Sequence, residues 1–321
     1  MKIWALGDAV IDLLPQGEMH YTACAGGAPV NVAVGAARLG CESGFIGRVG
    51  DDPFGHFLRN TLAEEGVDTQ PMQFDAQHRT STVLVSLGDE GDRSFTFLVD
   101  PSADQFLTAD TLPAFGNDIL HFCSLALVAT PCRDTLVRAI SYIKQRDGLL
   151  SFDINLRAQM WPDAQEMLDT VRHFARQADI LKLSQEELYW LAGTTQHEKA
   201  LEILRSYPSR LKVVTCGSDG AIVLWEDRLV QASAFQVESL DTTGAGDAFI
   251  AGLLASVAQG NTLVDLAQLK QAMTQASACG ALATTAKGAL AALPDAQGVV
   301  AFRQAAQALQ FDTGKICLPL G

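Results

Sequence analysis

The stretch SLDTTGAGDAFIAG, Ser239 to Gly252, contains three glycines, two threonines and two aspartates, and it becomes apolar from Ala248 onward. The apolar residues that begin at Phe249 recur at helical spacing, so a helix is expected to start near Gly244 or Ala245. Its first turn then holds glycines, and the main-chain N–H groups there have no intrahelical partner and a positive dipole. Such a helix end suits an anion, which glycine allows to approach the backbone closely.

An ordinary capped helix accounts for the same residues. Thr242 or Thr243 would then be the N-cap, and Asp247 would be a partner of the helix dipole. In the anion-binding interpretation, Asp247 is held ionised among the free N–H groups and points at whatever binds beside the anion. Spacing alone leaves both interpretations open.

The composition excludes several classes of partner. The chain of 321 residues has 37 acidic and 23 basic side chains, a formal net charge of -14, which repels nucleic acids and anionic membranes. Seven cysteines form no C-x-x-C pair and no zinc-ligand spacing, which is typical of free thiols in a reducing compartment. No apolar run reaches the roughly 18 residues of a membrane span. We therefore expect a cytoplasmic protein with no nucleic-acid or membrane partner and no structural zinc.

Strand and helix patterns alternate along most of the chain, which predicts a parallel sheet with helices on both faces. An opening strand over Ile3–Leu14 carries Asp8 and Asp12. Further strands are expected at 119–122, 149–154, 180–183, 212–215 and 221–225, helices at 133–145, 164–176, 186–192 and 198–206, and helix again to about residue 309. The run Arg79–Val99 reads as a hairpin around an acidic glycine turn and predicts a small β appendage. No linker or fixed-period repeat divides residues 1–321, so one domain is expected.

Three segments together carry a family resemblance. DTTGAGDAF (241–249), GGAPVNVAVGAARLG (26–40) and GRVGDDPFG (47–55) closely resemble the signature regions of the ribokinase-like, or PfkB, family of carbohydrate kinases. RSFTFLVDPSADQF and TTAKGALAALP resemble most the bacterial fructokinase branch, which also contains aminoimidazole riboside kinases. The resemblance implies a three-layer αβα sandwich around a mostly parallel sheet. It also implies a small β-sheet lid, with elements near 14–25 and 79–105.

The resemblance gives the opening segment a catalytic role. Asp247 would be the base that takes the proton from a sugar hydroxyl, and the N–H groups of Gly244, Ala245 and Gly246 would form the anion hole for the transferred phosphoryl. This agrees with the chemistry, since phosphoryl transfer requires alignment and neutralisation of spreading negative charge.

The resemblance also implies a sugar site. Its expected residues are Asp8, Asp12, Gly26, Gly27, Asn31, Phe97 and Arg157. Arg157 lies in FDINLR, which is similar to the family's Asp-Pro-Asn-x-Arg segment, and would reach the γ-phosphate or the substrate; a surface salt bridge is the alternative. Phe95 and Phe97 share one face of the second hairpin strand, where they would cover the sugar or simply pack the lid.

The nucleotide would bind at two further segments by the same resemblance. The expected ATP-binding residues are Lys182, Ser184, Glu187, Thr215, Gly217 and Gly220. Without the family, VTCGSDGA (214–221) reads as a β-turn. In LKLSQEEL, Glu187 fits the family's Asn-x-x-Glu pattern and Ser184 replaces its Asn. Magnesium would act through waters and ATP oxygens, as suits a hard cation that keeps its hydration.

A monovalent-cation site is implied by likeness to ribokinase. It would use Asp241, Thr243 and the carbonyls of Ala283, Ala286 and Gly288. Ala292 stands where a hydroxyl ligand would lie, which leaves potassium dependence open.

The sequence thus predicts an ATP-dependent kinase that phosphorylates the primary hydroxyl of D-fructose to give fructose 6-phosphate, and that dimerises through its lid. A kinase for aminoimidazole riboside or ribose is the near alternative, although Val10, where ribokinase-type sequences often place Asn, argues weakly against ribose. A catalytically idle sugar- or nucleotide-binding protein remains a third option. An oxidoreductase is not supported, because no G-x-G-x-x-G follows an N-terminal strand.

Overall fold

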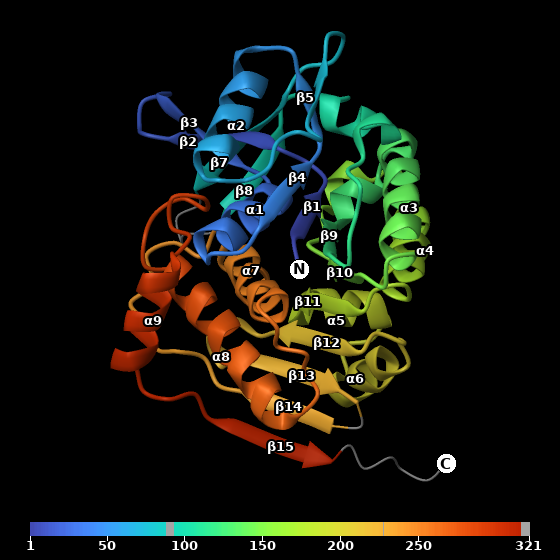
Figure 1. Ribbon diagram of the computed structural model, residues 1–321. Helices are drawn as coiled ribbons and strands as arrows, with labels where there is room; N and C mark the ends of the chain where they lie inside the picture. Colours follow the sequence, from blue (N-terminus) through green and yellow to red (C-terminus); the bar gives the residue numbers. More distant parts are fainter. Residues whose placement is uncertain (88–92, 227, 316–321) are drawn as a thin grey trace.

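The central sheet has nine strands in the computed structural model, which describes residues 1–87, 93–226 and 228–315. Its order is β15-β14-β13-β12-β11-β10-β9-β1-β4 (Figure 1). The strands are β1 (Ile3–Leu6), β4 (Ser43–Ile46), β9 (Ile119–Cys123), β10 (Leu149–Asp153), β11 (Ile180–Ser184), β12 (Leu211–Thr215), β13 (Ala221–Trp225), β14 (Arg228–Ala232) and β15 (Phe311–Lys315). From β4 to β12 neighbouring strands are parallel, and from β12 to β15 they are antiparallel.

Helices cover both faces of this sheet, so the predicted sandwich is confirmed (Figure 1). One face packs on α3 (Thr130–Lys144), α4 (Ala164–Ala175), α5 (Gln185–Ala192) and α6 (His197–Arg205). The other packs on α1 (Ala28–Arg38), α7 (Ala245–Ala258) and α8 (Leu266–Ala283). The strands alternate accordingly: Leu6 faces the first cluster and Ile3 the second, as the two-residue strand period requires. A third cluster adds α2 (Pro53–Glu64) and α9 (Ala296–Ala305).

The prediction of one opening strand over Ile3–Leu14 is wrong. β1 ends at Leu6, and a separate strand, β2 (Val10–Pro15), belongs to another sheet. Gly7 lies at the break with a positive φ of 149°, and a Cβ there would come 2.8 Å from the Pro29 ring of α1. Because glycine allows this close approach, the chain leaves the central sheet here and Asp8 falls in the connecting loop rather than on a strand.

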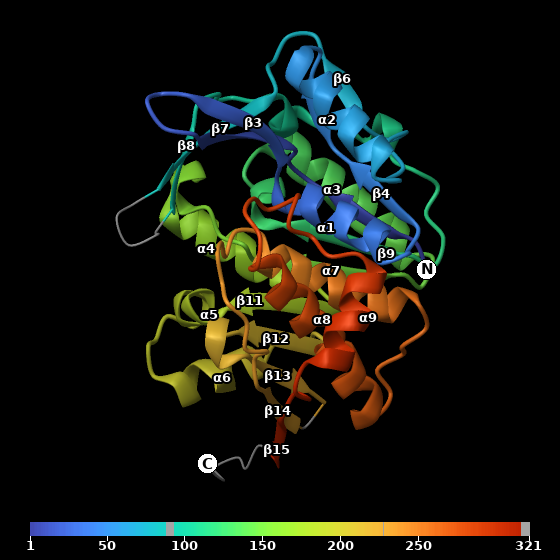
Figure 2. The same ribbon diagram turned by 90° about the vertical axis from the view of Figure 1, so that its left-hand side faces the viewer.

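A four-stranded sheet of order β3-β2-β7-β8 forms the lid. It consists of β2, β3 (Tyr21–Gly26), β7 (Ser81–Leu87) and β8 (Arg93–Phe97), and the predicted hairpin is its antiparallel β7–β8 pair. Figure 2 shows the lid at the opposite end of the molecule from β13, β14 and β15.

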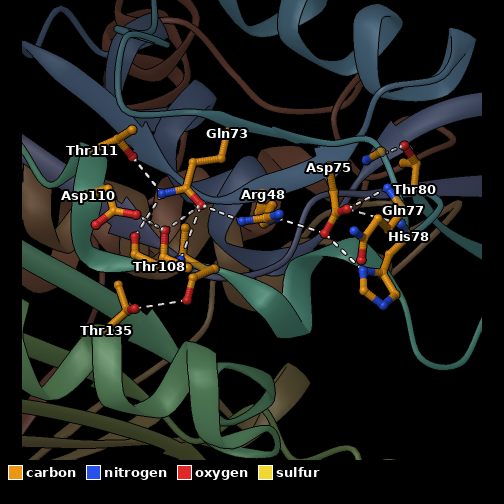
Figure 3. A network of polar contacts seen from close by, with 12 residues as sticks. Arg48, Gln73, Asp75, Gln77, His78, Thr80, Thr108, Asp110, Thr111 and Thr135 are labelled. Carbon is orange, nitrogen blue, oxygen red and sulfur yellow. Dashed lines mark hydrogen bonds and ion pairs between the residues drawn. The ribbon is translucent and has the colours of Figure 1, made fainter.

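A polar network at the base of the lid is centred on the two-stranded sheet of β5 (Arg48–Gly50) and β6 (Gln73–Asp75) (Figure 3). The buried Asp75 accepts hydrogen bonds from Arg48 and from the main chain of His78. Gln73 donates from its amide to the Thr108 carbonyl at 2.8 Å. These bonds tie the segments on both sides of the hairpin to the rest of the fold.

The C-terminal part is helical only in part, whereas helical structure was predicted to about residue 309. α8 ends at Ala283, α9 runs from Ala296 to Ala305, and β15 then adds an edge strand to the central sheet beside β14. The part of the chain that the structure describes contains no helix long and apolar enough to cross a membrane.

Candidate active site

A cavity of about 270 Å³ opens between the lid, the start of α7 and the carboxyl ends of the central strands β9, β10 and β11. This is the edge of a parallel α/β sheet at which ligands usually bind. Most residues predicted for the site line it. They are Asp8, Asp12, Gly27, Asn31, Phe97, Arg157, Lys182, Ser184, Glu187, Thr243, Gly244, Gly246 and Asp247.

The first turn of α7 has no side-chain cap. Its N-cap is Gly244, in the left-handed conformation with φ of 77°, and neither Thr242 nor Thr243 takes the N-cap position. The capped-helix interpretation is therefore wrong. Of the three predicted anion-hole groups, the Ala245 N–H donates to the Thr242 carbonyl at 3.2 Å, and Ala245 is not among the residues that line the cavity. Gly246 lies deeper in the open first turn, where N–H groups have no intrahelical partner.

Asp247 is buried at the cavity wall between two amide side chains. Asn31 donates to its Oδ2 at 2.8 Å, and Asn155 donates to its Oδ1 at 3.3 Å. Burial raises the pKa of Asp247, and the hydrogen bond from Asn31 opposes that rise. The two amides fix the carboxylate in one orientation, and a raised pKa makes it a better proton acceptor near neutral pH.

Asn155 is a site residue that the sequence analysis missed, although it lies within the quoted segment FDINLR. It follows β10 with a positive φ of 38°, unusual for a residue other than glycine. That conformation accompanies the turn of its amide toward Asp247. The sequence feature that could have identified Asn155 is its position two residues after Asp153, in an Asp-x-Asn pattern.

Carboxylates gather at the end of the cavity nearest the lid. Burial raises the pKa of Asp8 to about 7, and the negative charge of Asp104 adds to the rise. Asp12 lies on β2 and also lines the cavity. Gly26 does not line the cavity, and a Cβ at that position would collide with the Asp12 carboxylate. The glycine leaves the room that the Asp12 side chain occupies.

The lid closes this end with aromatic rings. Phe95 and Phe97, half-buried on β8, both line the cavity. The guanidinium of Arg157 lies 5.8 Å from the centre of the Phe95 ring, within reach of a cation–π contact. No salt bridge to Arg157 occurs within the described residues, so its predicted surface ion pair is not observed.

The opposite end of the cavity carries Lys182 and Glu187. Lys182 lies on β11 and pairs with Asp153 of β10 at 2.8 Å. Glu187 accepts main-chain N–H groups from Leu156 and Ser184, both at 2.7 Å. Ser184 caps α5, and its hydroxyl accepts the N–H of Glu187. Serine and the Asn of the Asn-x-x-Glu pattern expected from the resemblance can both cap a helix.

The second predicted nucleotide segment lies outside the cavity lining. Thr215 ends β12, and Gly217 and Gly220 form the turn into β13 with positive φ values of 57° and 96°. A Cβ at Gly220 would collide with the carbonyl of Ala232. The β-turn interpretation therefore explains why residue 220 is glycine, while the contacts of Thr215, Gly217 and Gly220 with a nucleotide stay a prediction.

The predicted cation-site segments lie side by side. The Asp241 carboxylate accepts N–H groups from Thr243 and Gly288, each at 2.9 Å, and the main-chain N–H of Asp241 donates to the Thr284 carbonyl. Ala283 ends α8, and Ala286 lies exposed in the loop that follows. No group of three or more His, Cys, Asp or Glu side chains within the described residues is arranged to hold a metal ion.

The model of the pfkB family of carbohydrate kinases matches residues 2–296. The chain belongs to this family. The predicted resemblance is thereby confirmed, and with it the assignment as a carbohydrate kinase.

Individual members of the pfkB family are similar over nearly the whole chain. A fructokinase of Klebsiella pneumoniae is 50% identical over 295 residues, which cover 91% of this chain and 96% of the relative. An aminoimidazole riboside kinase of Salmonella typhimurium is 39% identical over 91% of this chain and 92% of the relative.

Solved structures agree with this fold. Two crystal structures of the fructokinase from Vibrio cholerae O395 have a TM-score of 0.89 and 46% identity over 94% of this chain. In one structure, which holds fructose, ADP and a calcium ion, the similarity covers 98% of the fructokinase chain. In the other, a double mutant with fructose, ADP and a potassium ion, it covers 97% of the fructokinase chain.

Proposed function

We propose that this pfkB-family kinase is an ATP-dependent fructokinase, which transfers the γ-phosphoryl group of ATP to the primary hydroxyl of D-fructose and yields fructose 6-phosphate and ADP. The observation that carries the proposal is the cavity itself. It brings an oriented, buried Asp247 and the open first turn of α7 together with a carboxylate-lined end under the lid. Fructokinases about half identical to this chain support fructose as the acceptor.

The cavity supplies the two requirements of phosphoryl transfer. Asp247 accepts the hydroxyl proton as the sugar oxygen forms its bond to the γ-phosphorus, and the bond from that phosphorus to the leaving oxygen of ADP breaks. The N–H groups at Gly244 and Gly246, in the first turn of α7, stabilise the negative charge that spreads over the transferred group. Asn31 and Asn155 keep the Asp247 carboxylate aimed while it gains the proton.

The sugar would bind at the lid-covered end of the cavity, with its primary hydroxyl against Asp247. Asp8, Asp12 and Asn31 offer acceptors and a donor for sugar hydroxyls, Gly27 lines the same wall, and Phe97 covers it. A closed lid excludes water, which would otherwise take the phosphoryl in place of the sugar.

The donor set at the nucleotide end fits magnesium held by ATP and water. Both Glu187 oxygens already accept main-chain N–H groups, so this carboxylate suits an outer contact to a hydrated ion. When bound, magnesium neutralises the phosphate oxygens. We assign Lys182, Ser184, Glu187, Thr215, Gly217 and Gly220 to the nucleotide side.

Potassium is assigned to the loops around Asp241. The buried carboxylate of Asp241 accepts hydrogen bonds from the main chain of Thr243 and Gly288. Ala283 and Ala286 would add carbonyl oxygens, the ligand type that hard cations prefer. Bound there, the ion would stabilise the loop that precedes the anion hole.

The second candidate substrate is an aminoimidazole riboside, because the kinase for it is 39% identical to this chain. Both sugars offer a hydroxymethyl group on a five-membered ring. The test measures kcat/KM for fructose, ribose and aminoimidazole riboside in a coupled ADP-release assay, with and without potassium. Fructose is expected to be the best substrate, and an equal or higher kcat/KM for a riboside would defeat the assignment.

We further propose a single kinase domain that dimerises through its lid. The lid sheet ends in the edge strands β3 and β8, and such edges carry unpaired main-chain groups that favour pairing with a second sheet. Analytical ultracentrifugation tests this assignment: a monomer at micromolar concentration would contradict it. The cytoplasmic location stays a prediction.

A further inference from the structure

Lys182 and Asp153 form an unusual ion pair. The two residues lie on the neighbouring strands β11 and β10, and their charged atoms are 2.8 Å apart. Among the salt bridges of the described residues, it alone has both side chains less than a tenth exposed. Taking two charges out of water costs several kcal/mol per ion, so such a pair seldom stabilises a fold.

The hydrogen bonds of this pair are also incomplete. Oδ1 of Asp153 is buried and has no hydrogen-bond partner within the described residues. An ammonium has three N–H donors, and Asp153 is the acceptor found for Lys182 within the same residues. A purely structural pair would be expected to satisfy these groups. The unsatisfied groups indicate that the pair serves a ligand.

The ammonium lies beside the anion hole. Lys182 lines the cavity, and a Cβ placed on Gly246 would come 3.0 Å from its Nζ. Glycine at position 246 therefore leaves open the space between the ammonium and the first turn of α7. Burial opposes the charge of Lys182, but Asp153, Glu187 and Asp247 outweigh it and raise the pKa of the ammonium. Lys182 is thus cationic at neutral pH.

We propose that Lys182 is a catalytic residue. In the free enzyme its ammonium is held in position by the ion pair with Asp153. During transfer, an N–H of the ammonium that does not bond Asp153 donates to the γ-phosphoryl group. The proposal rests on the kinase function proposed above. No bond to lysine forms, and its proton stays on the nitrogen. The four cavity-lining carboxylates Asp8, Asp12, Glu187 and Asp247 outnumber the two cavity-lining cations, Lys182 and Arg157. A cation beside the transferred phosphoryl group therefore offsets part of the negative charge that these carboxylates and the phosphates bring together.

The role differs from ground-state ATP binding. A contact made equally in the ground and transition states changes KM, whereas one that strengthens in the transition state changes kcat. The experiment compares the wild type with Lys182→Met and with the double variant Asp153→Asn/Lys182→Met, using whichever sugar the wild type turns over fastest. Lys212→Met is the matched control, because Lys212 is also buried, on the next strand β12, and its ammonium bonds the Ser209 carbonyl outside the cavity.

Lys182→Met is expected to lower kcat by about 10²–10³-fold, the usual loss on removing one oxyanion donor, with KM for ATP changed less than about threefold. Affinity for ADP with aluminium fluoride should fall in parallel, while affinity for ADP alone should persist. The double variant carries no buried unpaired charge, so it should fold even if the single variant does not, and its kcat should stay equally low. Lys212→Met should keep the wild-type kcat.

Two results would overturn the proposal. If the double variant recovers more than about a tenth of the wild-type kcat, Lys182 only balances Asp153. If Lys182→Met raises KM for ATP at constant kcat, it is a ground-state contact. A wild type that phosphorylates no sugar defeats the kinase function instead, and the aluminium fluoride comparison then decides on Lys182 separately.

Discussion

The floor of the cavity and its lid hold their side chains in different ways. On the floor, Asp247 and Lys182 are almost fully buried and bonded to partners on other segments. On the lid, Phe95 and Phe97 are half-buried, and the next residue, Leu98, is 53% exposed. Residues that stabilise charge in the transition state act more strongly when they are fixed in place and shielded from water. A lid, in contrast, must open to admit the substrate. Variants should therefore affect turnover most on the floor and substrate affinity most on the lid.

The largest effect is expected from Asp247→Ala. Loss of the proton acceptor should lower kcat by about 10²–10⁴-fold, the range for general acid–base catalysis, while the protein stays folded. Steady-state kinetics and thermal unfolding measure the two properties. A variant that keeps more than about a hundredth of the wild-type rate would show that another group accepts the proton.

Asp8 lies in the loop between β1 of the central sheet and β2 of the lid, so it belongs to the boundary between floor and lid. Its effect on the enzyme is expected to depend on pH. Its carboxyl has a pKa of about 7, so it is ionised at pH 8 and mostly protonated at pH 6. A protonated carboxyl loses acceptor capacity for sugar hydroxyls, and kcat/KM for fructose should fall about tenfold over this range. Asp8→Asn should give a lower and flatter profile. Parallel pH profiles for the two proteins would contradict the role of Asp8.

Asp8 also affects stability with a definite sign. Its folded-state pKa lies above the ordinary value of 3.8, so the folded state binds the proton more tightly than the unfolded state. The free energy of unfolding contributed by Asp8 should therefore fall as pH rises from about 4 to 7. In urea titrations, Asp8→Asn should remove this decline, while a wild-type decline that persists unchanged in the variant would exclude Asp8 as its source.

A variant of the lid should change the affinity for fructose, and this change should be smaller than the effects expected at Asp247 and Asp8. Phe97→Ala removes part of the apolar cover, worth about 1 kcal/mol or roughly fivefold in KM for fructose, with little change in kcat. ATP hydrolysis without transfer should increase. Leu98→Ala is the matched control, since it changes an exposed neighbour on the same strand extension. An equal rise of KM in both variants would remove the special role of Phe97.

The smallest effect on turnover is expected at the base of the lid, shown in Figure 3. Thr80 precedes β7, and its main-chain N–H and hydroxyl both donate to Asp52 while the hydroxyl accepts the Gly50 N–H. Thr80→Val should lower the free energy of unfolding by about 1–3 kcal/mol and leave kcat within about threefold. Thr80→Ser keeps the hydroxyl and should be near wild type. Urea denaturation measures the difference, and equal loss in both variants would point to packing instead.

The sequence predicted most of the architecture because the periodicity of buried residues is a local signal. The start of α7 came within one residue, and the antiparallel hairpin was found from its β-rich runs and glycine turn. The opening strand was mispredicted, since Ile3–Leu6 and Val10–Leu14 are both mostly apolar and only packing against Pro29 reveals the break at Gly7. The edge strand β15 was not predicted, because it forms only by pairing with β14, which lies far away in the sequence.

For the site, the sequence by itself determined the chemical groups and the position of the glycine-rich helix start, because these depend on neighbouring residues and on a family-wide pattern, while the absence of a side-chain cap at that start came from the structure. Tertiary structure alone decided which groups meet. Asn31 and Asn155 reach Asp247 across 216 and 92 residues of chain, and Lys182 reaches Asp153 from the adjacent strand. The physical reason is that burial, orientation and the pairing of charges are properties of space, which the order of residues along the chain does not state.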